Sequence, residues 1–130
     1  MNFKKEIINV TTISGIKRGD VFLADLGNLP SQKSSVQRGF RPVVIISNNI
    51  NNKYSPTVNI VPLSTAPKKS MPMHVRLSKD LVGLDYDSIA LCEQTSVLDK
   101  SSLSQHIVTL GTDIMRKIEN CIVLQYSIGV

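Results

Sequence analysis

Two arginines stand just before an unbroken apolar run in the first half of the chain. Arg38 and Arg41 precede Val43–Ile46, whose β-branched residues predict a strand buried on both faces. Pro42 fixes its own φ and restricts Arg41 to an extended conformation. A cationic side chain is therefore expected at the mouth of a rigid strand, where it could bind an anion. The alternative is a solvated arginine that only flanks the strand.

The histidines and cysteines lie far apart in the sequence. His74, His106, Cys92 and Cys121 show none of the spacings typical of metal ligands, so no metal or other cofactor is expected. Both cysteines stand in apolar runs, which predicts buried free thiols rather than a disulfide. His74 could transfer a proton near neutral pH, although a strand histidine is more often packed. Glu93, at the end of a predicted strand, is a second candidate acid or base, or else part of a structural ion pair.

Basic residues are concentrated in one long segment. The chain has 130 residues and a net charge of +5, yet no acidic residue lies between Asp25 and Asp80. That interval holds eight of the fifteen basic residues: Lys33, Arg38, Arg41, Lys53, Lys68, Lys69, Arg76 and Lys79. A segment of one sign attracts polyanions, which favours nucleic acid or another anionic partner. The alternative is a surface that is basic but merely soluble.

The pattern of short apolar segments predicts a mainly β domain. Strands are expected over 19–25, 43–47, 57–64, 73–77, 88–93 (continuing towards 97) and 106–110. A C-terminal helix is expected with Thr112 as its N-cap and Gly129 as its stop. Many short strands before one terminal helix predict an α+β domain built as a small twisted β-barrel, capped by that helix.

Local signals refine this outline. Turn formers over 48–56 are expected to link two antiparallel strands, and Pro62 indicates a bulge or an edge position. One domain is predicted over 16–130, with 1–15 as an extension that is either an added strand or a loose arm. The apolar run after Lys4 and Lys5 is too short for a signal peptide, and no stretch is long enough to cross a membrane. A cytoplasmic protein is therefore expected.

Five segments occur in an order that matches a known family: KRGDVFLADLG, QRGFRPVVIISNN, NNKYSPTVNIVPLS, PMHVRL and DSIALCEQ. From Lys17 onward the chain resembles the MazF/PemK toxins, bacterial endoribonucleases of type II toxin–antitoxin pairs. The resemblance implies an SH3-like barrel of the CcdB/PemK type and a homodimer. It also implies metal-independent cleavage of single-stranded RNA that leaves 2′,3′-cyclic phosphate and 5′-hydroxyl ends. The implied partner is an antitoxin with an acidic C-terminal segment, in a complex that binds operator DNA.

The resemblance also assigns site residues. Arg41 matches the family's catalytic arginine and would stabilise charge on the phosphoryl oxygens. Ser64 stands where the family usually carries threonine, and its hydroxyl can make the same donation. Positions that contact RNA in family members, together with basic neighbours suited to phosphates, are Gln37, Arg38, Gly39, Asn48, Lys68, Lys69, Met71, Pro72 and Gln94.

Departures from the family pattern leave several points open. Ser96 and Val97 replace the arginine and threonine that usually follow EQ, so the RNA sequence that is cut cannot be carried over. The antitoxin and the general base also stay open. One alternative is a CcdB-like gyrase poison, although that type relies on a C-terminal tryptophan and this chain has none. The other is a catalytically silent nucleic-acid-binding module.

Overall fold

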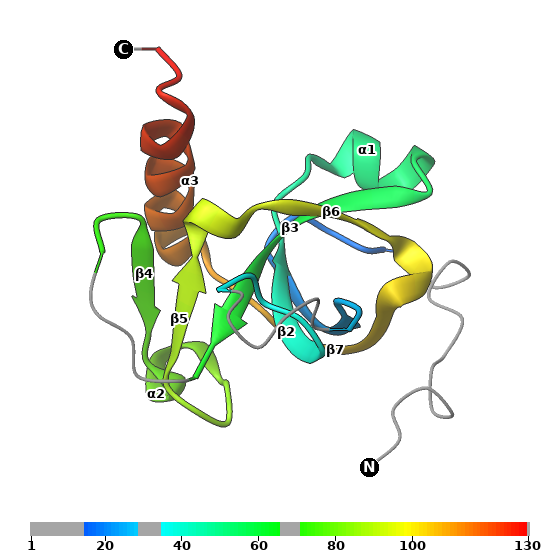
Figure 1. Ribbon diagram of the computed structural model, residues 1–130, viewed down its shortest axis with the longest axis horizontal. Coiled ribbons are helices and arrows are strands. Elements are labelled where there is room, and N and C mark those ends of the chain that lie inside the picture. Colours follow the sequence, from blue (N-terminus) through cyan, green and yellow to red (C-terminus); the bar gives the residue numbers. More distant parts are fainter. Residues whose placement is uncertain (1–14, 29–34, 66–70, 130) are drawn as a thin grey trace.

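The protein is an antiparallel β structure with a long C-terminal helix (Figure 1). The computed structural model describes residues 15–28, 35–65 and 71–129. The strands are β1 (Asp20–Asp25), β2 (Phe40–Ile45), β3 (Thr57–Ser64), β4 (His74–Leu77), β5 (Ser88–Leu91), β6 (Ser96–Asp99) and β7 (Leu103–Thr109). The helices are α1 (Asn49–Tyr54), α2 (Lys79–Val82) and α3 (Thr112–Tyr126), with single 3₁₀ turns η3 (Cys92–Gln94) and η4 (Lys100–Ser102). The predicted class, mainly β with a terminal helix, is confirmed.

The sheet bends at its central strand. Its order is β4-β5-β3-β2-β1-β7, and β6 also pairs with β3. The first half of β3, Thr57–Ile60, pairs with β6, whereas Leu63 and Ser64 pair with β5. Pro62 lies between these two pairings and faces Val43 of β2 on its other side. The prediction of an edge position for Pro62 was therefore wrong. A residue without an N–H is tolerated in this central strand because the strand changes partner there.

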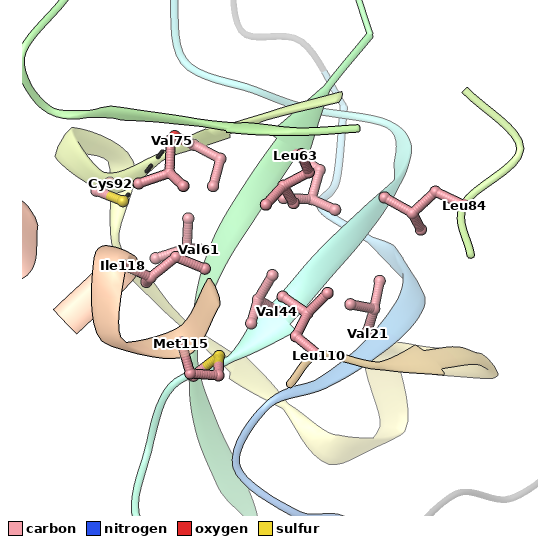
Figure 2. Close-up of a cluster of buried hydrophobic side chains, with 12 residues drawn as sticks. Val21, Val44, Val61, Leu63, Val75, Leu84, Cys92, Leu110, Met115 and Ile118 are labelled. Carbon is pink, nitrogen blue, oxygen red and sulfur yellow. Dashed lines mark hydrogen bonds between the residues drawn. The ribbon is translucent and has the colours of Figure 1, made fainter. Parts of the chain in front are cut away.

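The central strands are buried on both faces, as the run Val43–Ile46 predicts. Val43 and Ile45 contribute to one apolar cluster, together with Phe22, Val58 and Leu103. Val44 points to the opposite face. There it belongs to a cluster of Val21, Val61, Leu63, Val75, Leu77, Leu84, Ala90, Cys92, Leu110, Met115 and Ile118 (Figure 2). Met115 and Ile118 of α3 close this second cluster, so the helix covers one face of the sheet beside β4 (Figure 1).

Two local predictions were wrong and one was incomplete. The strand at 88–93 does not continue to Val97, because η3 turns the chain and β6 starts anew on β3. The linker at 48–56 joins two antiparallel strands, as predicted, but it also contains a helix, α1, which Asn48 caps by accepting from the Asn51 amide at 2.8 Å. Gly111, not Thr112, is the N-cap of α3, since its carbonyl accepts from the Met115 amide at 3.0 Å.

The C-terminal helix ends earlier than Gly129. Ser127 is its C-cap in the left-handed conformation, with φ of 53°. Within the part of the chain that the structure describes, no helix is long and apolar enough to span a membrane. The predicted extension over 1–15 lies outside the described residues, apart from Gly15.

Candidate active site

Arg41 and Ser64 come from two paired strands. Val43 of β2 faces Pro62 of β3 in an antiparallel pair, and the pairing of these strands ends at these two residues. Arg41 lies two residues before Val43, and Ser64 lies two residues after Pro62. Side chains alternate along a strand and directly opposed residues share a face, so Arg41 and Ser64 fall on the face of Val43 and Pro62. The two predicted catalytic side chains therefore come from adjoining strands and share one face.

The Arg41 guanidinium is oriented by the chain that precedes it. Its Nε donates to the Arg38 carbonyl at 2.7 Å. Gly39, between them, has φ of 79°, a left-handed conformation that strains residues with a side chain. Arg41 is half-buried, and no described carboxylate forms an ion pair with it. Its terminal nitrogens are thus left for an external anion.

Ser64 ends β3 with its hydroxyl buried. The residue is 2% exposed, and its Oγ has no hydrogen-bond partner among the described residues. Buried hydroxyls are normally paired, so an unpaired one in a strand is unusual. Substrate would reach this hydroxyl only after neighbouring atoms move aside.

A buried histidine–glutamate pair lies on the same face as Ser64. Val75 of β4 and Leu63 of β3 both face Ala90 of β5, and these three residues point into the cluster under α3. Their neighbours His74 and Ser64 therefore point to the opposite face. There His74 Nε2 lies 3.1 Å from Oε2 of Glu93, the middle residue of η3. This pair was not foreseen as a contact, although both residues were proposed separately as acid or base.

The buried polar atoms without a partner coincide with the predicted site. In the described part of the chain these atoms are Gln37 Oε1, Ser64 Oγ, His74 Nδ1 and Glu93 Oε1. All four residues were selected from sequence for catalysis or RNA binding. Each unpaired buried group needs an explanation, and a role in function is one of them.

A cavity of about 700 Å³ is lined by two of these residues, Gln37 and Glu93, but not by Ser64 or His74, nor by Arg41. It is lined by Leu26, Gly27, Asn28, Val36, Gln37, Arg38, Pro62, Glu93, Gln94, Thr95, Ser96, Val97 and Leu98. Four of the predicted site residues thus share one hollow, with the basic Arg38 at its wall. Sequence reasoning missed Leu26–Asn28, Thr95 and Leu98, because only the fold brings the start of the β1–β2 loop against β6.

Other predicted residues lie apart from this cavity. Asn48 caps α1 and lines a second hollow of about 510 Å³, which shares Thr95 with the first. The second hollow also contains Arg18, which donates to the Glu119 carboxylate at 2.9 Å and was not predicted. Met71 and Pro72 are exposed before β4.

Two lysines, His106 and the expectation about metal ligands remain. Lys68 and Lys69 lie outside the described residues. His106 contacts Asp20 and Thr109 and ties β7 to β1, as a structural residue would. The part of the chain that is described contains no group of three or more His, Cys, Asp or Glu that could hold a metal ion.

Solved structures share this architecture and define its class. One is an endoribonuclease in complex with its cognate antitoxin from a mycobacterial species. Its TM-score is 0.71, and it is 22% identical to this protein, with 89% of this chain and 99% of that chain covered. MazF from Deinococcus radiodurans gives a TM-score of 0.71 and 17% identity over 86% and 96%. At such low identity these matches establish the fold, that of the MazF toxins.

Sequence similarity defines the family. Residues 17–126 match the family described as PemK-like, MazF-like toxin of type II toxin–antitoxin system. Endoribonuclease MazF of Staphylococcus epidermidis is 41% identical over 116 residues, which cover 88% of this chain and 92% of the relative. Its counterpart from Staphylococcus saprophyticus is 42% identical over 108 residues, 82% and 88% of the two chains. The chain belongs to the MazF/PemK family of toxins.

Proposed function

We propose that the protein cleaves single-stranded RNA without a metal ion, by attack of a ribose 2′-hydroxyl on the adjacent phosphorus. By class it is an endoribonuclease, the name that both staphylococcal relatives carry. The products would be a 2′,3′-cyclic phosphate and a 5′-hydroxyl. The observation that supports this mechanism is that Arg41 and Ser64 come from the paired strands β2 and β3 and share one face of the sheet with His74.

Charge stabilisation falls to Arg41 and Ser64. As the nucleophile attacks, negative charge grows on the phosphoryl oxygens. The guanidinium donates through a planar fork that fits two such oxygens. Its Nε is already held by the Arg38 carbonyl, so the guanidinium is fixed before substrate arrives. The Ser64 hydroxyl, unpaired in the free protein, donates to the same phosphate.

Proton transfer falls to the His74–Glu93 pair. The reaction needs an acceptor for the 2′-hydroxyl proton and a donor for the leaving 5′-oxygen. Glu93 holds one ring nitrogen of His74, and the other, Nδ1, is buried and unpaired among the described residues. Nδ1 would exchange a proton with RNA once neighbouring atoms move aside. A carboxylate that orients the imidazole is a recurrent arrangement in acid–base catalysis.

The RNA path follows the basic interval. Arg38 and Gln37 line the larger cavity, Gly39 shapes the turn between Arg38 and Phe40, and Met71 and Pro72 stand exposed before β4. Asn48 lines the second hollow, and Lys68 and Lys69 would contact RNA phosphates. Unpaired bases are generally read through their edges by amides and backbone groups, which suits Gln37.

Partners follow from the same charge pattern. An antitoxin with an acidic C-terminal segment would occupy the basic interval as an RNA mimic, and the solved mycobacterial relative is bound to its cognate antitoxin. A homodimer would cover the apolar end of α3, where Val123, Leu124, Tyr126 and Ile128 are 40–59% exposed. The toxin–antitoxin complex would bind operator DNA, and the protein would act in the cytoplasm.

The test is cleavage of a long mixed-sequence RNA by purified protein in EDTA, with both new ends mapped. We expect discrete cuts with cyclic-phosphate and 5′-hydroxyl ends. Arg41→Ala should abolish them and leave the circular dichroism spectrum unchanged, while Arg116→Ala on the exposed face of α3 serves as the charge-matched control. Full cleavage by Arg41→Ala would refute the site.

Two other outcomes would favour the alternative functions. Binding of diverse RNAs without any cut would favour a silent binding module. Inhibition of gyrase with RNA left intact would favour a CcdB-like poison.

A further inference from the structure

The oxygen and the nitrogen of the Gln94 side-chain amide both form hydrogen bonds with backbone groups of another segment. Its Oε1 accepts from the Gln37 amide at 2.9 Å, and its Nε2 donates to the Ser35 carbonyl at 3.0 Å. Gln94 ends η3, next to Glu93, whereas Ser35 and Gln37 lie 57–59 positions earlier, just before β2. One side-chain amide therefore ties the segment just before β2 to the turn η3, which contains Glu93.

From this fastening a chain of hydrogen bonds leads to the catalytic guanidinium. The Gln37 carbonyl accepts from Arg38 Nη1 at 3.3 Å, and the Arg38 carbonyl accepts from Arg41 Nε at 2.7 Å. Displacement of Gln37 would therefore be passed to Arg38 and then to Arg41.

A second fastening holds the same segment from the other side. The Gly39 amide donates to the Gly27 carbonyl at 2.7 Å, and the Gly39 carbonyl accepts from the Leu26 amide at 2.9 Å. These bonds fix Gly39 to the end of β1, and the two bonds from Gln94 hold Ser35 and Gln37 to η3. Without Gln94, the described contacts of the Gln37 backbone would be reduced to the one with Arg38.

We propose that Gln94 is a positioning residue: it fastens residues 35–37 to η3 and so sets the Arg41 guanidinium relative to the His74–Glu93 pair. This inference rests on the proposed function and changes the role that family resemblance gives to position 94. A glutamine that reads a base must offer its amide to RNA. Here both polar atoms of that amide already bond to backbone, which leaves one lone pair of Oε1 and one N–H of Nε2.

The first test separates placement from binding. In steady-state cleavage of RNA, we expect Gln94→Ala to lower kcat about 10- to 100-fold, the scale of an ångström misplacement at a reacting centre. KM should stay within about threefold and the cut positions should not change, because only the transition state needs the aligned guanidinium. Gln94→Glu keeps the acceptor for the Gln37 amide and should recover part of the loss. Gln105→Ala, at an exposed position of β7, is the matched control.

The second test does not depend on activity. Hydrogen exchange followed by NMR should show at least about tenfold faster exchange of the Gln37 amide and of Arg41 Nε–H in Gln94→Ala than in wild type or Gln105→Ala. Altered cut positions or a raised KM with kcat retained would overturn the inference in favour of base reading. Unchanged exchange at both atoms would overturn it as well. If wild type cuts no RNA, the proposed function fails, and the exchange result alone decides whether Gln94 holds Arg41.

Discussion

His74 Nε2 lies 3.1 Å from Glu93 Oε2, and the two side chains are 5% and 23% exposed. The pair joins the start of β4 to η3, which are also tied by the Cys92 amide donating to the Met73 carbonyl at 3.2 Å. Because His74 Nδ1 and Glu93 Oε1 are buried and unpaired among the described residues, the contact leaves hydrogen-bonding capacity unused. A purely structural pair would be expected to use it.

Replacement of His74 by glutamine tests whether this pair transfers protons. We expect His74→Gln to lower the cleavage rate about 10²- to 10⁴-fold, the usual contribution of general acid–base catalysis. The free energy of unfolding should fall by about 1–3 kcal/mol, because Glu93 keeps only a weaker partner. Cleavage kinetics and urea unfolding measure the two effects. His106→Gln, on β7, should leave cleavage unchanged, and equal loss in both variants would contradict the assignment.

Arg41→Lys tests whether charge alone is sufficient. Lysine keeps the positive charge but lacks the Nε that the Arg38 carbonyl holds and the planar fork that meets two phosphate oxygens. We expect cleavage to fall at least about 100-fold, the scale found when one oriented transition-state donor is lost. RNA affinity, measured with a 2′-deoxy analogue that cannot be cut, should change little. Near-normal cleavage by the lysine variant would mean that the oriented fork is not needed.

Ser64→Ala should separate activity from stability. The Ser64 hydroxyl is buried and unpaired, so its removal relieves an unsatisfied group and should leave the free energy of unfolding unchanged or slightly higher. Cleavage should nevertheless fall about 10- to 1000-fold, because a donor to the transition state is lost. Thermal unfolding and cleavage rates measured on one preparation give both quantities. A stability loss with full activity would show that Ser64 is only structural.

Much of this fold could be predicted from local pattern. Val43–Ile46 predicts its strand because β-branched residues without polar interruption require burial on both faces. The separate strand β6 could not be predicted, because CEQTSV contains neither glycine nor proline to signal the break after Leu91. Helix α1 was missed because the asparagines that favour turns also cap helices.

The candidate site likewise contains residues that the sequence could indicate and contacts that it could not. Arg41 and Ser64 were proposed as site residues because family motifs single them out. The contact of His74 with Glu93 depends on the register of β4 on β5 and on the turn at η3, which the sequence does not reveal. The fastening by Gln94 joins residues 57–59 positions apart, beyond the reach of any local pattern.

Cys92 makes stability depend on pH in the alkaline range. Burial, and then the neighbouring Cys121 thiol, raise the pKa of Cys92 from 9.0 to about 12. Between these values the unfolded chain releases the thiol proton while the folded chain keeps it. The free energy of unfolding should therefore fall as pH rises from 9 to about 12, by at most about 1.4 kcal/mol per pH unit. Below pH 9 this contribution should be constant.

Urea unfolding of wild type and Cys92→Ala across this range isolates the effect from other titrating groups. The alanine variant starts lower, because a buried side chain is truncated, but should lose less stability per pH unit. Alkylation at pH 8.5 gives a second measurement: Cys121, which is partly exposed, should react in the folded protein, and Cys92 only after unfolding. Parallel pH curves for the two proteins, together with rapid labelling of Cys92, would mean that its thiol is not held protonated by the fold.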